Sequence, residues 1–371
     1  MIETLNNNLE FINGYIPSDK PKIIGIERFK SGASFINDVF MCTTRTGEQY
    51  VIKIANPNWP RVKTLNEVLS IKIVRQKTTI PTPNVLGYCL DKENPIQHEF
   101  IIMDMMEGVP LSLVYDDIKN THNFEKILDN LADYISQLRK IPYEEIGNFT
   151  LDEDRGIRVM SPIEIYSPSD LKAPMSFAEY YLRILSYYRR VISKSDFLND
   201  VDKESLKKYI DNVIELLKTR RFSKESFVFS HQDFVMKNIL VKGEKVVGIV
   251  DWEWAGPNIF EMESLSGFDF LEKKEHRAHF KARLKNLKCR IFLEKAHSLR
   301  QKIIEFSGLI YRIASFEEWI GKKPFLHTAR LIKDKLFQRW VKGNKMNDSK
   351  TIKSIILKDI HAKHANLHPQ E

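Results

Sequence analysis

The chain has 371 residues, of which 43% are hydrophobic and 29% are charged. This composition is ordinary for a globular protein and excludes a disordered one, and the length exceeds the ~100 to 200 residues usual for one domain, so we expect two lobes. No apolar run of about 18 residues occurs, and the opening stretch MIETLNNNLEFING lacks the basic and apolar blocks of a secretory signal. We therefore expect no membrane contact and a cytoplasmic protein.

The three cysteines, Cys42, Cys89 and Cys289, are odd in number and widely spaced, which fits neither a disulfide framework nor a CxxC metal site. The net charge of +8 comes from the last hundred residues, because residues 271–371 hold 24 Lys and Arg against 10 Asp and Glu. Runs such as FKARLKNLKCR (280–290) are typical of a helix with a solvated basic face. Nucleic-acid binders usually add aromatic stacking residues in a recognisable module, so we do not expect a nucleic-acid partner.

The first hundred residues are rich in strand patterns. Between residues 22 and 104, short β-type runs such as VFMCTT and YVIKIA alternate with turn signals such as TRTGEQ, and one helical stretch, TLNEVLSIKIVRQK, interrupts them. We expect residues 1–104 to form a β-rich N-lobe with one main helix.

From about residue 110 the pattern becomes helical. In NFEKILDNLADYISQLRKI the apolar residues from Phe124 to Leu138 form one face, and Pro142 ends the helix. Residues 143–176 are rich in Pro, Asp and Ser and indicate a long irregular connection. We expect a C-lobe over residues 105–341, followed by a weakly ordered basic tail, residues 342–371, whose histidines are more typical of a frayed end than of a metal site.

The run FSHQDFVMKNILV (229–241) is an island of strand pattern within this helical region. Expected strands at 226–230, 238–241 and 246–252 place Asp233 and Asn238 on a loop, with Asp251 after the next apolar run. A carboxylate, an amide five residues later and a second carboxylate suit phosphoryl transfer, in which a base accepts the proton of the attacking hydroxyl while Mg²⁺ neutralises phosphate charge. We expect Asp233 to be the base, and Asn238 and Asp251 to bind the metal.

HQDFVMKNILV followed by GIVDWEWAGP resembles the signature of the aminoglycoside phosphotransferase and choline kinase-like family. Other segments resemble the family in the same order: VIKIA (51–55), TLNEVLSIKIV (64–74), IPTPNVLGY (80–88) and the lobe-linking FIIMDMMEG (100–108). The resemblance covers residues 24 to 270 and implies an α+β, two-lobed protein-kinase-like fold with ATP and Mg²⁺ as cofactors.

The resemblance also implies roles for single residues. Lys53 would contact the α- and β-phosphates, Glu67 would pair with Lys53, and Asp104 (backbone C=O) and Met106 (backbone N–H) would hold adenine. The phosphate loop, FKSGASFINDVF (29–40), would use Ser31, Gly32 and Ser34.

Three departures from the family pattern are visible. The phosphate loop has one glycine where the family usually has a pair. The usual HGD is HQD, so Gln232 adds a side chain, which we expect to leave the roles of its neighbours unchanged. The segment after IVDWE usually holds an aspartate, and here offers Glu261 and Glu263.

These features predict an enzyme, an ATP-dependent small-molecule kinase that phosphorylates a hydroxyl. Its partners would be the nucleotide and the acceptor; the oligomeric state is left open. The stretch 251–272 has six carboxylates and no Lys or Arg. Because a cleft of one sign concentrates the opposite charge, it favours an amine-bearing acceptor such as an aminoglycoside, bound by Glu253, Glu261 and Glu263. The alternative is a pseudokinase or nucleotide-binding scaffold without phosphotransfer, although scaffolds commonly lose the base or a metal ligand.

Overall fold

The protein is described by a computed structural model over residues 1–29, 37–55, 62–161, 172–194, 200–220, 227–259 and 268–289, with single positions between 300 and 310. The chain divides into two compact units, the first formed by residues 1–175 and 225–296 and the second by residues 176–224 and 297–371. The strand-rich region and the run 229–241 both belong to the first unit. The predicted lobe boundary coincides with the end of a strand at Asp104, and the division into lobes stays a prediction.

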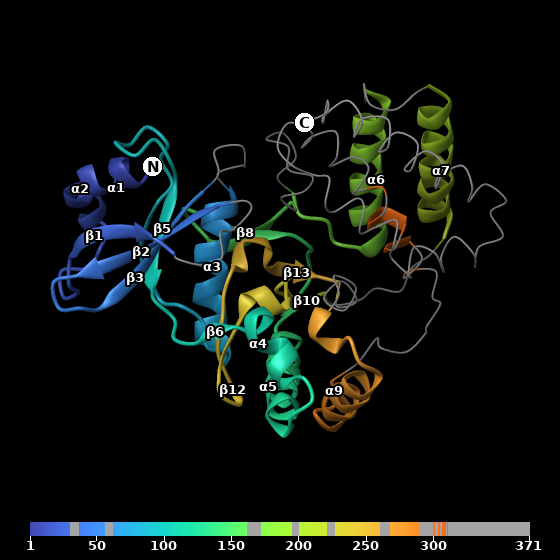
Figure 1. Cartoon of the computed structure of the whole chain (residues 1–371). Coiled ribbons are helices and arrows are strands. Elements are labelled where there is room, and N and C mark those ends of the chain that lie inside the picture. The colour runs from blue at the N-terminus through green and yellow to red at the C-terminus, as the bar shows by residue number, and fades with distance from the viewer. Residues whose placement is uncertain are drawn as a thin grey trace, which may run out of the picture. The chain divides into compact units, whose positions relative to one another are not determined.

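A five-stranded antiparallel sheet forms the N-terminal part of the first unit, in the order β1-β2-β3-β5-β4 (Figure 1). Strand β2 alternates buried and partly buried side chains, whereas the inner strand β5 is buried at four successive positions. A turn at Gly47 (φ 85°) closes the β2–β3 hairpin. The strands are β1 (Ile23–Arg28), β2 (Asp38–Thr44), β3 (Gln49–Ile54), β4 (Val85–Cys89) and β5 (Phe100–Asp104).

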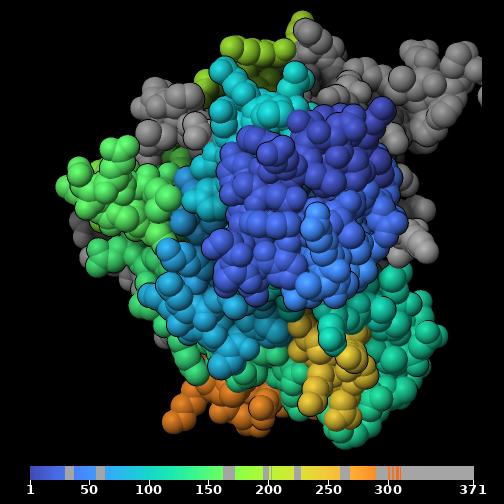
Figure 2. Space-filling view, turned by 90° about the vertical axis from the view of Figure 1, so that its left-hand side faces the viewer, coloured from blue at the N-terminus to red at the C-terminus, as the bar shows by residue number. Residues whose placement is uncertain are grey.

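Each face of this sheet contributes to a different hydrophobic core. Phe100 and Ile102 belong to a cluster with Leu5 and Ile12 from two short helices, α1 (Ile2–Asn7) and α2 (Leu9–Asn13), which the sequence did not predict. The alternate residues Ile101 and Met103 belong to the larger core. In Figure 2 the N-terminal residues, coloured blue, form a continuous layer over this side of the unit.

Helix α3 (Val62–Lys77) packs its apolar residues into the larger core, as the pattern of residues 64–77 predicted. The other helices that the structure describes in this unit are α4 (Leu111–Ile118), α5 (His122–Leu138) and α9 (Lys274–Asn286). Helix α5 buries the predicted face from Phe124 to Leu138, but it ends at Leu138, four residues before Pro142.

Three small antiparallel sheets complete the first unit: β13-β10-β7, β12-β11-β6 and β8-β9. The expected strands around the catalytic run are present as β10, β11 and β12. The bounds are β6 (Val109–Pro110), β7 (Pro142–Tyr143), β8 (Asn148–Asp152), β9 (Gly156–Met160), β10 (Phe227–Ser230), β11 (Ile239–Lys242), β12 (Lys245–Ile249) and β13 (Gly256–Asn258). Single-turn 3₁₀ helices lie at η2 (Met236–Asn238), η3 (Trp252–Trp254) and η4 (Asp269–Leu271).

The expectation of an irregular connection over residues 143–176 is wrong for its first part. Residues 148–160 form the β8–β9 hairpin, in which Asn148 pairs with Met160 and a turn at Gly156 (φ 74°) starts the return strand. The pattern did not predict β8 because the apolar Leu151 is exposed while the polar Asn148 is buried. Residues 162–171 lie outside the described ranges.

In the second unit, α6 (Phe177–Ser193) and α7 (Asp200–Thr219) pack against each other. The Ser176 hydroxyl caps α6 by accepting from the Glu179 N–H, and Arg189 joins the helices through an ion pair with Asp211 at 2.6 Å. The predicted tail 342–371 lies outside the described residues. None of the helices that the structure describes is long and apolar enough to cross a membrane.

Candidate active site

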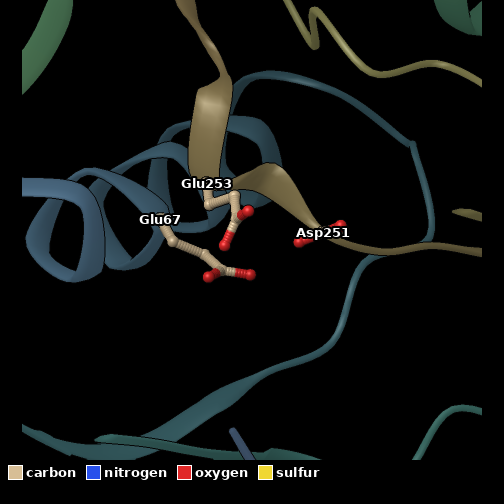
Figure 3. Close-up of side chains that lie close together, drawn as sticks. All are labelled: Glu67, Asp251 and Glu253. Atoms are coloured by element: carbon tan, nitrogen blue, oxygen red, sulfur yellow. The ribbon is translucent and has the colours of Figure 1, made fainter. Parts of the chain in front are cut away.

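Lys53 lies at the centre of a cluster of buried charges. Its Nζ is 2.7 Å from Glu67 Oε2, 2.7 Å from Asp251 Oδ1 and 2.9 Å from Glu253 Oε2. Figure 3 shows the three carboxyl groups converging from α3 and from the segment after β12. The predicted pair of Lys53 and Glu67 therefore forms, and the candidate metal ligand Asp251 is part of the same cluster.

Local backbone geometry brings these groups together. Lys53 lies on β3, a central strand, between Val39 and Ile101 of the neighbouring strands, so its side chain is covered. Asp251 has a left-handed backbone (φ 67°, ψ 57°), which turns the chain abruptly from β12 into η3. Aspartate tolerates this conformation better than most residues, because its short side chain can satisfy nearby polar groups.

A second buried lysine, Lys63, joins the cluster and was missed by sequence reasoning. Its Nζ is 3.0 Å from Glu253 Oε2 and 3.3 Å from Asn37 Oδ1, while Asn37 Nδ2 donates to the same Glu253 oxygen at 2.6 Å. A signal was present, because Lys63 precedes Glu67 by four residues and therefore lies on the same helix face. We refer to Lys53, Lys63, Glu67, Asp251 and Glu253 as the lysine cluster.

Burial and pairing shift the pKa values within the lysine cluster in opposite directions. Burial alone would lower the pKa of Lys53, but the three carboxylates around it, Asp251 foremost, raise that pKa well above its usual value. Burial lowers the pKa of Lys63, and it raises the pKa of Glu67 to about 7 against the pull of Lys53. At Asp251 burial opposes ionisation, yet the charge of Lys53 holds the pKa below its usual value.

The candidate base lies on the loop from His231 to Asn238, which we call the catalytic loop. Asn238 Nδ2 donates to the Asp233 backbone oxygen at 3.0 Å and to Asp233 Oδ2 at 2.9 Å, and Lys237 Nζ is 3.0 Å from the same Oδ2. No described residue donates to Asp233 Oδ1. The loop therefore fixes one carboxylate oxygen and leaves the other available to a hydroxyl.

His231 is buried and holds the catalytic loop. Its Nε2 lies 3.1 Å from the Val250 carbonyl, and its Nδ1 accepts from the Asp233 N–H at 3.2 Å. These partners require the neutral ring with hydrogen on Nε2, and burial, which lowers the pKa of His231, favours that form. The ring thus joins Asp233 to the strand that leads into Asp251.

Two groups of oxygen atoms could hold a metal ion. The side-chain amide nitrogen of Asn238 donates to Asp233, and no described residue donates to Asn238 Oδ1. That oxygen can therefore bind a hard cation, with Asp251 as the second ligand. Glu67, Asp251 and Glu253 also offer oxygens within 4.8 Å of one another, but the ammonium of Lys53 contacts all three. The chemistry of the first pair fits Mg²⁺, which needs few protein ligands.

The other predicted site residues are distributed as follows. Asp104 ends β5, where its N–H donates to the Asn84 carbonyl at 3.0 Å, and Met106 lies in the link to β6. Glu253 is buried in the lysine cluster, so the prediction that it binds an acceptor stays a prediction. Ser31, Gly32, Ser34, Glu261 and Glu263 lie outside the described residues.

Curated relatives share short stretches with the chain. The match is 26% identical over 93 residues with the mitochondrial altered inheritance of mitochondria protein 9 of Meyerozyma guilliermondii, covering 25% of the chain and 15% of that protein. A subtelomeric hrmA-associated cluster protein of Aspergillus fumigatus is 30% identical to the chain over 91 residues, which cover 23% of the chain and 18% of that protein. The chain thus spans less than a fifth of the length of these relatives.

Solved structures match over most of the chain. A gentamicin complex of APH(2")-IIa aligns with a TM-score of 0.54 and 14% identity over 84% of this chain and 89% of that chain. A mutant of the aminoglycoside phosphotransferase APH(4)-Ia with ADP and hygromycin B aligns with a TM-score of 0.53 and 13% identity, over 97% of this chain and 98% of that chain. A putative fructosamine-3-kinase from Thermobifida fusca aligns with a TM-score of 0.53 and 14% identity, over 84% of this chain and 92% of that chain. These similarities show the kinase-like fold.

The family model described as the phosphotransferase enzyme family matches residues 25–263, which is more than half of the chain. The matched range contains the whole lysine cluster and the whole catalytic loop, including Asp233 and Asn238. The chain therefore belongs to the phosphotransferase enzyme family.

Proposed function

We propose that the protein is an ATP-dependent phosphotransferase that moves the γ-phosphoryl group to a hydroxyl of a small molecule. The observation that carries the proposal is the state of Asp233, one oxygen of which is fixed by Asn238 and Lys237 while the other has no donor among the described residues. A general base has to be oriented and yet free to accept a proton, and this arrangement meets both needs.

On the nucleotide side, Lys53 would contact the α- and β-phosphates. Its ammonium is buried and held in place by Glu67, so it is positioned before the nucleotide arrives. We assign adenine to the backbone of Asp104 and Met106, and the phosphates also to the loop with Ser31, Gly32 and Ser34. This part of the proposal rests on family membership and on the order of these segments along the chain.

Asn238 Oδ1 and Asp251 would hold Mg²⁺, which supplies charge neutralisation at the phosphates. Asn238 would have a double role, because its amide nitrogen donates to Asp233 while its amide oxygen would bind the metal. Asp251 remains bound to Lys53 through Oδ1, which leaves its second oxygen for the cation. Asp233 thus contacts Asn238, Asp251 contacts Lys53, and the Val250 N–H joins the two pairs by donating to the Asn238 backbone carbonyl at 3.0 Å.

For the acceptor we propose an amine-bearing alcohol, with aminoglycosides as the first class to test. Two of the structural neighbours are described in complex with gentamicin and with hygromycin B, but at 13 to 14% identity they support the fold and not the substrate. The acidic stretch 251–272 supports a positively charged acceptor. Its carboxylates at Asp251 and Glu253 face lysines, so the attraction depends on Asp233, Asp269 and the glutamates between residues 260 and 267.

The test is a coupled assay of ADP release with MgATP over a panel of aminoglycosides, neutral sugars and amino alcohols, at low and high salt. We expect release with an amine-bearing acceptor, with kcat/KM falling as salt screens the attraction. Asp233→Asn is the control that should abolish acceptor-dependent release. Tight binding of nucleotide with no ADP release from any acceptor would favour the alternative, a nucleotide-binding scaffold.

A further inference from the structure

Three consecutive backbone carbonyls just after Asp251 are held by side-chain amides from separate elements. Asn66 Nδ2, on α3, donates to the carbonyls of Glu253 and Ala255, both at 2.9 Å. Gln232 Nε2, on the catalytic loop, donates to the Trp254 carbonyl between them at 2.8 Å. The segment that follows the metal ligand is therefore fixed on one side by the helix of Glu67 and on the other by the neighbour of Asp233.

The amide of Gln232 is itself oriented. Asn258 Nδ2 donates to Gln232 Oε1 at 2.7 Å, and Asn258 is buried. Because one end of the amide accepts from Asn258, the other end has to present its N–H groups to Trp254. Gln232 thus bridges two points of the segment 254–258, and a shorter or reversed side chain could not make both contacts.

The backbone of Gln232 is strained because the residue carries a side chain. Its φ of 67° lies in the left-handed region, where a residue with a Cβ is strained and glycine is not. The motif that this run resembles has glycine at this position. A strained residue of this kind persists where the surrounding structure over-determines it. Here the over-determining contacts are the two hydrogen bonds of the side chain.

We propose that Gln232 is a positioning residue that joins the catalytic loop to the segment after Asp251 and so sets the placement of the base Asp233 relative to the metal ligand. This inference rests on the proposed function. A displacement of reacting groups by about 1 Å can lower the rate about 10²-fold. A side chain that fixes the distance between these two segments therefore affects kcat. Lys53 stays paired with Glu67 on α3, which Gln232 does not hold, so we expect nucleotide binding to change much less than turnover.

The experiment compares Gln232→Gly with Gln97→Gly. Gln97 is a matched control: it is also a glutamine with left-handed backbone (φ 60°), it is exposed, and no described residue forms a hydrogen bond with its side chain. Glycine relieves the backbone at both positions. We expect both variants to keep or raise the thermal midpoint, and only Gln232→Gly to lower kcat, by about tenfold, with KM for MgATP within about twofold of wild type.

Gln232→Glu keeps the shape and the backbone but removes the donor to Trp254, and we expect it to lower kcat as Gln232→Gly does. In a double-mutant cycle, Asn258→Ala combined with Gln232→Gly should add little further loss, since both act through one amide. If Gln232→Gly keeps kcat within about twofold of wild type, or if its loss of kcat follows a fall in the thermal midpoint, the side chain is merely structural and the proposal fails.

Hydrogen exchange separates this proposal from the proposed function. The Ala255 N–H donates to the Trp252 carbonyl at 3.0 Å, so loosening of the segment should raise exchange at residues 252–258. We expect that rise in Gln232→Gly and not in Gln97→Gly, whether or not an acceptor has been found. Absence of any phosphotransfer by the wild type would refute the proposed function, whereas unchanged exchange in Gln232→Gly would refute the positioning role.

Discussion

The lysine cluster and the catalytic loop lie in the same unit but differ in how far their charged side chains are exposed to solvent. In the cluster, charges are buried and pair with one another: the side chains of Lys53, Lys63 and Glu67 are 9%, 3% and 3% exposed. In the loop, the charges are open to solvent, with Asp233 at 29% and Lys237 at 61%. The loop owes its shape to amide and backbone contacts instead.

This difference matches what the proposed function requires of each region. A group that holds a polyanionic nucleotide works best if it is fixed and desolvated beforehand, because its field is then strong and needs no reorganisation. A base must exchange a proton and admit an acceptor, so it has to stay accessible. Changes in the cluster should therefore affect folding as well as binding, whereas changes in the loop should affect turnover and leave folding intact.

The largest expected effect is on the loop side. Asp233→Asn keeps the shape and the contact with Lys237 but cannot accept the proton, so kcat should fall by the ~10² to 10⁴ typical of an acid–base group. Nucleotide affinity and the thermal midpoint should change little. The measurement is steady-state kinetics beside nucleotide titration, and near-normal turnover would remove Asp233 from the role of base.

The matching change in the lysine cluster is Lys53→Met, which leaves the buried Glu67 and Glu253 and the partly buried Asp251 without the ammonium that they share. Breaking a buried ion pair in this way costs about 3 to 5 kcal/mol of folding free energy. Urea denaturation should show this loss, and Lys242→Met, which breaks an exposed pair with Glu107, should show almost none. Equal stability of the two variants would contradict the contrast between buried and exposed charge.

Asp251 of the lysine cluster also connects the two regions in the proposed function, since it pairs with Lys53 and is a proposed metal ligand together with Asn238. Asp251→Asn tolerates the left-handed backbone, so it tests the charge without adding strain. We expect the Mg²⁺ concentration needed for half-maximal nucleotide binding to rise by roughly tenfold or more, with turnover falling in parallel. An unchanged Mg²⁺ titration would place the metal elsewhere.

The smallest expected effect is that of Lys237→Met. The side chain is mostly exposed, so water already screens its charge and the free energy of unfolding should stay nearly unchanged. Turnover should fall by less than about tenfold, and the difference from wild type should shrink as salt is raised. If this variant unfolded as easily as Lys53→Met, the loop could not be described as held by amides.

Residue order along the chain was enough to predict where the candidate site lies. The run from His231 to Asn238, followed by Asp251, predicted the base loop and its flanking strands, because apolar runs between turn signals specify strands locally. The apolar period of α5 predicted its buried face in the same way. The pair of Lys53 and Glu67 was predicted from resemblance, and the structure brings it together.

Only the tertiary structure decided how these parts hold one another. The amide of Asn66 reaches Glu253 across 187 residues of sequence, and Asn37 reaches the same glutamate across 216. The expectation that Gln232 leaves its neighbours unaffected missed its bond to Trp254, 22 residues away. Local patterns encode which residues a strand or helix buries, but a single amide or lysine on a surface pattern looks like any solvated residue. Its partner is fixed only when distant segments fold against each other.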